Sequence, residues 1–180
     1  SRNIQTIWYS IMGTLTVDNL NLAGTSVSQL GKIIQIVQTT KTDTFSTTAT
    51  TFTDVTGLSA SITPSSTSNK VLVMVSSNSS TSGGNNAMMR LARGGTGIFV
   101  GDTASSRVLA SAQSRVADTN GAVTLTFSFL DTPSTTSATT YQVQYEVQAG
   151  TGTINRTQSD TDNANIARTA SSIILMEVRA

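Results

Sequence analysis

The sequence predicts an all-β protein, an antiparallel jelly-roll β-sandwich preceded by a short extended N-terminal stalk. Serine and threonine make up about a third of the 180 residues, and threonine, being β-branched, suits a half-exposed pleated surface. Short apolar runs alternate with clusters of Ser, Thr, Gly, Asn and Asp, as in sandwiches and barrels. No segment sustains the apolar spacing of an amphipathic helix. An antiparallel sandwich is the simplest architecture for so many strands.

The first 31 residues differ from the rest of the chain. Residues 1–11 contain the only tryptophan, Trp8, and precede Met12, a candidate native start. They are either non-native sequence or an anchoring extension whose Trp8 packs on a partner. Residues 12–31 alternate briefly and then turn at 23–24, which indicates a stalk or docking arm. Such a ribbon buries no face alone, so we expect it to contact a larger assembly. Residues 32–180 form the predicted jelly-roll head.

Within the head the pattern predicts many short strands. Tyr141, Val143, Tyr145 and Val147 alternate with Gln and Glu, so this strand has one core face. Segments 71–75 and 173–178 are apolar on both faces, and their second face needs cover by a neighbouring subunit or a folded-over loop. The predicted strands are residues 32–39, 42–46, 51–55, 58–63, 70–77, 86–92, 97–100, 107–113, 122–130, 140–148 and 171–179.

The composition disfavours several classes of function. The chain has no histidine and no cysteine, which removes the usual general base, metal ligand and thiol nucleophile. We therefore expect no enzyme activity and no cofactor. The net charge is +1 and the basic residues are scattered, which argues against a nucleic-acid partner. The longest apolar runs are only of strand length, so we expect no insertion into a membrane.

Few carboxylates lie close together. Asp160 and Asp162 are the exception and make a weak Ca²⁺ candidate, although turn chemistry is the better explanation because the glycine and distal glutamate of an EF-hand are absent. Glu146 could serve a glycosidase with a distant aspartate, but its place on a glutamine-lined strand face favours an ordinary surface carboxylate. The Gly-rich residues 94–97 lack the Lys-Ser/Thr of a phosphate loop and predict a turn.

Four segments resemble small fibre and tail-fibre proteins of marine tailed phages. They are residues 52–64 (FTDVTGLSASITP), 66–73 (STSNKVLV), the terminal strand 172–178 (SIILMEV) and the opening 12–24 (MGTLTVDNLNLAG). The resemblance covers about half of the chain, and Ser/Thr-rich β-proteins converge in composition. It implies a virion protein with a short N-terminal stalk and a trimeric jelly-roll head similar to those of tumour necrosis factor and C1q. The chain lacks the repeats or heptads of a long fibre shaft, which favours a short fibre, a knob or a decoration protein.

We therefore expect a homotrimer on the virion surface that contacts other virion proteins through the N-terminal arm. Its long polar loops, residues 76–86, 102–106, 131–139 and 150–165, either bind a host-surface glycan or protein or are solvated connections. The alternatives to attachment are a purely architectural capsid or tail protein and, least favoured, a polysaccharide-degrading hydrolase. The candidate receptor-binding side chains in or beside these loops are Asn78, Asn85, Asn86, Asp102, Asp131, Asn155 and Arg156.

Overall fold

The structure is a computed structural model that describes residues 21–22, 25–26 and 31–180. The predicted extension at 1–11 and most of the predicted stalk at 12–31 lie outside the described residues. Within that stalk, β1 (Asn21–Leu22) pairs antiparallel with β2 (Thr25–Ser26). In the described part of the chain no helix has the length and apolar character needed to span a membrane.

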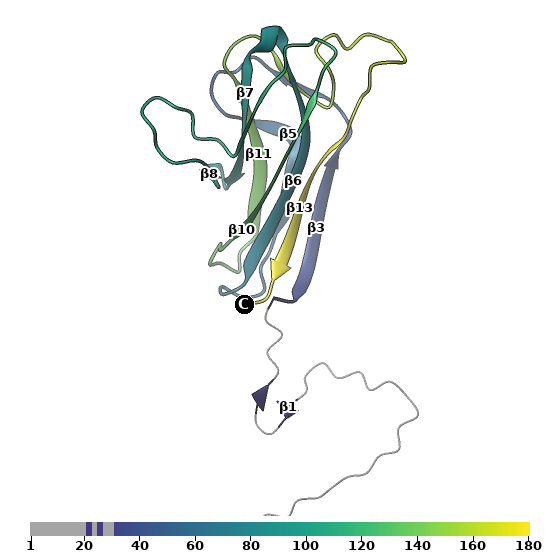
Figure 1. The fold of residues 1–180 in the computed structure, drawn as a ribbon. Coiled ribbons are helices and arrows are strands. Elements are labelled where there is room, and N and C mark those ends of the chain that lie inside the picture. Colours follow the sequence, from purple (N-terminus) through teal and green to yellow (C-terminus); the bar gives the residue numbers. More distant parts are fainter. Residues whose placement is uncertain (1–20, 23–24, 27–30) are drawn as a thin grey trace, which may run out of the picture.

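The head consists of two antiparallel sheets packed face to face (Figure 1). A single turn of 3-10 helix, η1 (Ser82–Gly84), interrupts the strands. The strands are β3 (Ile33–Lys41), β4 (Phe45–Thr47), β5 (Thr53–Ile62), β6 (Lys70–Thr81), β7 (Asn86–Arg93), β8 (Thr96–Ile98), β9 (Ala112–Arg115), β10 (Val123–Asp131), β11 (Thr139–Val147), β12 (Gly152–Ile154) and β13 (Ser171–Val178).

The strand order confirms the predicted jelly roll. One sheet runs β3-β13-β6-β10, and the short strands β12 and β4 extend it beyond the end of β13. The other sheet runs β5-β11-β7, with β8 and β9 both paired to β7. The eight main strands, in chain order, are β3, β5, β6, β7, β8, β10, β11 and β13. Numbered from one to eight in this order, they form one sheet with the order 1-8-3-6 and a second with the order 2-7-4-5. Two antiparallel sheets connected in this way form a jelly roll.

The core lies between the sheets and follows the predicted alternation. Tyr141, Val143, Tyr145 and Val147 are fully buried, which confirms that both tyrosines belong to the core. The hydroxyl of Tyr145 exchanges a hydrogen bond with Ser79 Oγ at 2.7 Å, so a buried polar group is satisfied. The remaining core side chains include Val55, Leu58, Ile62, Val71, Val73, Val75, Met89, Leu91, Ile154, Ile173 and Leu175.

Glycine accounts for one error in the predicted strands. Segments 51–55 and 58–63, predicted as two strands, form the single strand β5, which contains Gly57 at φ +80°. Opposite it, the register of β11 shifts between Gln142 and Gln144, so the glycine marks a bulge rather than a chain break. At residues 94–95 the predicted turn is confirmed, since Gly94 and Gly95 both have positive φ between β7 and β8.

Other errors concern loops and strands of similar composition. The predicted loop 76–86 is strand as far as Thr81, and the predicted loop 150–165 contains β12. The predicted strand 107–113 is mostly loop, because β9 begins only at Ala112. At the start of the loop between β8 and β9, Phe99 stacks on Phe129 of β10, with ring centroids 5.1 Å apart.

Candidate functional site

The outer face of the β3-β13-β6-β10 sheet carries an ordered set of apolar side chains. Across the four strands, register places Ile36, Met176, Leu72 and Leu130 in one row. The neighbouring residues on the same strands point into the core, where Val71 and Leu175 are fully buried. The row therefore faces away from the core.

The next rows change gradually from apolar to polar. Ile174 and Met74 are flanked by Gln38 and Ser128, and the row beyond contains only hydroxyl side chains. None of the side chains in these three rows is charged. We use the name apolar face for Ile36, Leu72, Met74, Leu130, Ile174 and Met176; the hydroxyl row is Thr40, Ser172, Ser76 and Thr126.

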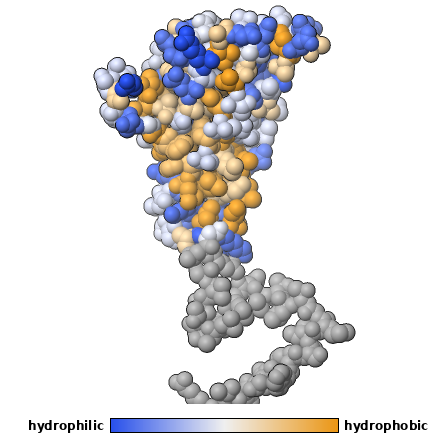
Figure 2. Space-filling model, in the orientation of Figure 1, coloured by the Kyte–Doolittle hydropathy of each residue, from blue (hydrophilic) through white to orange (hydrophobic). Residues whose placement is uncertain are grey.

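The apolar face is open to solvent in the single chain. Ile36 is 61% exposed, Leu130 45% and Met74 42%. Figure 2 shows hydrophobic side chains gathered over the narrow lower half of the molecule, the half that contains the C-terminus in Figure 1. A shallow pocket of about 380 Å³ lies between Met74, Ile174 and Thr126. Monomeric soluble proteins seldom expose a contiguous apolar patch of this kind.

The predicted receptor-binding loops do not converge on one surface. Residues 82–85 and 148–170 lie at the end of the sandwich far from the C-terminus, residues 132–138 lie at the C-terminal end, and residues 99–111 project from the side (Figure 1). Asp102, in this side loop, is exposed. Three of the four predicted asparagines donate hydrogen bonds to neighbouring residues: Asn78 to Ala170 O at 3.1 Å, Asn85 to Ser82 O at 2.8 Å and Asn86 to Gln148 Oε1 at 3.0 Å.

Two of the predicted site residues, Asp131 and Asn155, are buried and form hydrogen bonds within the protein. Asp131 accepts hydrogen bonds from Arg93 Nη1 and Tyr141 Oη, both at 2.6 Å. Burial and the Asp131 carboxylate raise the pKa of Tyr141, so its phenol stays protonated. Asn155 is fully buried, with φ +64°. Both residues therefore face the protein interior, where a receptor cannot reach them.

Asn155 and its neighbour Arg156 fasten the loop after β12. The Asn155 amide donates to Lys41 O at 2.9 Å and Asp43 O at 3.0 Å, and its carbonyl accepts from Ser171 Oγ at 2.6 Å. Arg156 donates to the carbonyl oxygen of Thr157 at 3.2 Å. These contacts shape the loop and leave little of either side chain for a ligand.

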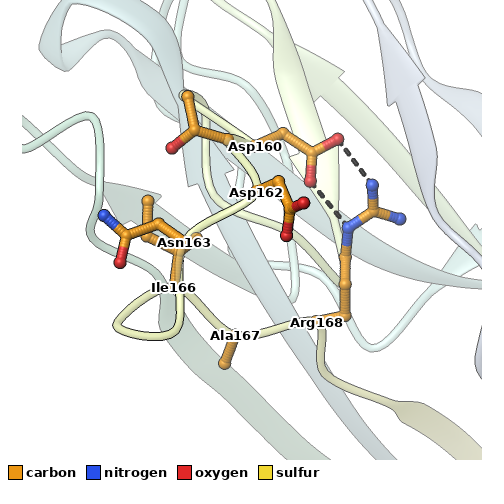
Figure 3. Close-up of a pocket in the computed structure, with 7 residues that line it drawn as sticks. Asp160, Asp162, Asn163, Ile166, Ala167 and Arg168 are labelled. Atoms are coloured by element: carbon orange, nitrogen blue, oxygen red, sulfur yellow. Dashed lines mark hydrogen bonds and ion pairs between the residues drawn. The ribbon is translucent and has the colours of Figure 1, made fainter.

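The weak Ca²⁺ candidate has an internal partner for one of its carboxylates. Arg168 donates from Nε and Nη2 to the two oxygens of Asp160, at 2.6 and 2.7 Å (Figure 3). Asp162 is exposed and lines the same hollow of about 290 Å³. No group of three or more carboxylate, histidine or cysteine side chains that could hold a metal occurs among residues 31–180. Asp160 thus forms an ion pair with Arg168, and in the same loop the Asn163 side chain accepts a hydrogen bond from Asn165 N at 2.9 Å.

The signal for the apolar face was present in the sequence, but only in part. Segments 71–75 and 173–178 were predicted to be apolar on both sides, and they supply Leu72, Met74, Ile174 and Met176. Ile36 and Leu130 were not predicted to join them, because their place depends on register between distant strands.

Comparisons with known proteins give little more than the architecture. No protein-family model matches the chain, and no curated protein matches its sequence. Among solved structures, a structure of infectious bursal disease virus, Gx strain, matches over 94% of this chain at 14% identity and a TM-score of 0.38. The VP2 subviral particle of the same virus matches over 91% at 13% identity and a TM-score of 0.33.

The chain is distantly similar in structure to these viral proteins. It spans 43% of the length of each matched chain. A likeness this remote gives no information about activity, partners or location, and the functional conclusion below rests on the surface of the chain itself and on the sequence resemblance.

Proposed function

We propose that this protein is a structural component of a tailed-phage virion, a homotrimeric fibre or knob that contributes to host attachment. The observation that carries the proposal is the apolar face. Burying large aliphatic and thioether side chains contributes about 1.5–3 kcal/mol each. A chain that leaves several of them exposed on adjacent strands gains stability by association.

Further copies of the same chain are the partner that fits this surface. The apolar face and the hydroxyl row are uncharged, and on the other side of the apolar face the exposed Lys70 pairs with Val178, so this surface has little with which to select an oppositely charged partner. In a three-fold assembly the apolar ends of the three copies would meet around the axis, so that each subunit covers apolar side chains of the other two. When the subunits contact one another only at the apolar face, their hydroxyl rows and their opposite ends stay out of contact.

The resemblance of four segments to small phage fibre proteins supports a three-fold assembly and a place on the particle. In that arrangement residues 12–31 contact other virion proteins, and the loops far from the C-terminus point outward. Three weak sites on one head would bind a repetitive host surface through avidity, without strong individual contacts.

An architectural role without receptor binding is the second candidate. It is favoured by the internal contacts of Asp131 and Asn155, which remove two predicted binding residues from the surface. Deleting the gene separates the two roles. Intact particles that fail to adsorb support attachment, and fragile particles support the architectural role.

Multi-angle light scattering on the full chain tests the assembly. We expect a mass three times the chain mass of 18.8 kDa. Replacing Ile36 and Leu130 by aspartate should yield monomers, because two buried charges at the interface would be unpaired. Thr40→Asp with Thr126→Asp, in the hydroxyl row of the same sheet, is the matched control and should remain trimeric. A wild-type monomer at micromolar concentration would refute the trimer.

A further inference from the structure

The outer face of the second sheet is polar, and most of its side chains satisfy one another. Asp54 accepts hydrogen bonds from the amides of Gln142 and Gln144 at 2.6 and 2.7 Å. Arg90 donates to Gln144 Oε1 at 2.8 Å, and its guanidinium lies 4.1 Å from the centre of the Phe52 ring. Asp54, Gln142, Gln144 and Arg90 therefore form one connected network on this half of the face.

Glu146, on the same face, is different. Its side chain lies in the row Glu146, Met88, Gln113 across β11, β7 and β9. The residue is only 5% exposed, and among the residues that the structure describes none donates a hydrogen bond to its carboxylate or forms an ion pair with it. Burial raises the pKa of Glu146, and the positive charge of Arg90 only partly offsets this effect. The carboxylate oxygens of Glu146 are not among the fully buried, unpartnered polar atoms of the described residues, so solvent reaches them, and a carboxylate that no protein group pairs is open to a ligand.

Glu146 lines a pocket of about 470 Å³. Met88 and Gln113 line it from the neighbouring strands, Arg107 and Val108 from the side loop 99–111, and Gln148 from the residue after β11. Met88 and Val108 supply apolar surface, while the amides and Arg107 supply donors. The volume is in the range of small-molecule sites.

The charge balance of the lining restricts the chemistry of the ligand. One carboxylate and one guanidinium line the pocket, so a cation would meet Arg107 and an anion would meet Glu146. A ligand whose groups both donate and accept satisfies the carboxylate and the amides at once, and hydroxyls do this. A polyhydroxylated ring also has C–H surface that can lie on Met88 and Val108.

We infer that this pocket binds one sugar unit of a neutral saccharide, with ring hydroxyls donating to the Glu146 carboxylate and accepting from Gln113 and Arg107. The inference names the receptor chemistry for the attachment role proposed above, and its biological meaning rests on that role. Glu146 is the only carboxylate among the residues that line the pocket, whereas glycoside hydrolysis uses two facing carboxylates. The proposed activity is therefore binding without cleavage.

Methyl NMR of the full chain tests the site, with ¹³C-methionine as the label and the Met88 methyl group as the reporter. The probes are neutral trisaccharides of gluco, manno, galacto, xylo and fuco configuration, added up to about 10 mM because single sugar sites are weak. Trigalacturonate and spermidine are the charged comparators. We expect a saturable shift of Met88 with at least one neutral probe and about tenfold weaker binding to Glu146→Gln, which loses a charge-assisted hydrogen bond.

Asp54→Asn is the matched control, since it neutralises a carboxylate on the same sheet face outside the pocket, and it should bind as the wild type does. No Met88 shift with any neutral probe, a response to a charged comparator alone, or equal binding by Glu146→Gln would overturn the site. A monomer that binds the saccharide would refute the trimer and leave the site standing, whereas a trimer that binds none would refute the site alone.

Discussion

Two buried glutamates have opposite electrostatic surroundings. Glu177, on the core side of β13, is 2% exposed, and its Oε1 accepts from Ser65 N at 2.6 Å, Ser65 Oγ at 2.8 Å and Asn69 Nδ2 at 2.6 Å. Burial alone would raise the pKa of Glu177, but these hydrogen bonds and the charge of Arg179 lower it below 4.5. Glu146 has no such donors, and its pKa is raised above 4.5. Ionised Glu177 thus stabilises the fold, while ionised Glu146 opposes it.

Replacing Glu177 by glutamine should lower the free energy of unfolding by about 1–2 kcal/mol at pH 7, because three charge-assisted hydrogen bonds weaken. The lowered pKa gives stability that is present above pH 4.5 and is lost as the pH falls through the folded-state value. Urea unfolding at pH 7 and pH 3 measures the difference between variant and wild type. That difference should shrink at pH 3, and an equal difference at both pH values would mean that the charge has no role.

Replacing Glu146 by glutamine should have the opposite sign and raise the free energy of unfolding at pH 7 by less than about 1 kcal/mol, since the charge it removes has no protein partner but is screened by solvent. Because the folded pKa is raised, the stability linked to protonated Glu146 is present below pH 4.5 and is lost as the pH rises through the folded value. The gain from the substitution should therefore be largest at neutral pH. A destabilised variant at pH 7 would mean that the carboxylate has an internal role in the fold.

At the scale of elements, the short strand β12 belongs to the β6 sheet and packs against β11 of the other sheet. It adds to the edge of β6 beyond β13, and Ile154 reaches the core. Its first residue, Gly152, lies so close to β11 that an added Cβ would clash with Val147 and would be 2.6 Å from Tyr145 Cε1. The glycine is required by close approach, not by an unusual φ.

Gly152→Ala should therefore destabilise the protein by about 1–3 kcal/mol, the usual range for overpacking a core. Thermal unfolding at fixed protein concentration measures the effect. Gly101→Ala is the control, because Gly101 has open space where its Cβ would be, and it should unfold like the wild type. Equal midpoints for the two variants would mean that β12 shifts freely.

The elements differ in how far the sequence could predict them. Strand β11 was predicted almost to its ends, because strict alternation of apolar and polar residues has one structural solution. Strand β12 was missed, since three residues inside a run of Ser, Thr and Asn carry no alternation. The apolar face was half predicted, as apolar strands can be recognised locally but their register cannot. The Glu146 pocket could not be predicted from the sequence, because part of its lining comes from a loop about forty residues away along the chain.

At the scale of the whole molecule, the jelly roll separates two surfaces of different character. The outer face of β3-β13-β6-β10 is mainly apolar at the C-terminal end and carries hydroxyl side chains beyond it, whereas the opposite sheet is rich in amides and charges. The core between them holds both faces rigid. Association through one sheet therefore leaves the other sheet, and the pocket beside Glu146, open to solvent.

The described ends of the head also lie together. Gly31 N donates to Arg179 O at 2.7 Å, and Arg179 N donates to Lys32 O at 2.9 Å, at the same end as the apolar face. A protein fused after Ala180 would therefore crowd the apolar face, where we propose that the subunits meet. A peptide inserted in the exposed stretch 161–165 would lie at the far end, away from the apolar face, and the proposed trimer would display three copies of it, which makes that loop a suitable position for foreign sequence on this scaffold.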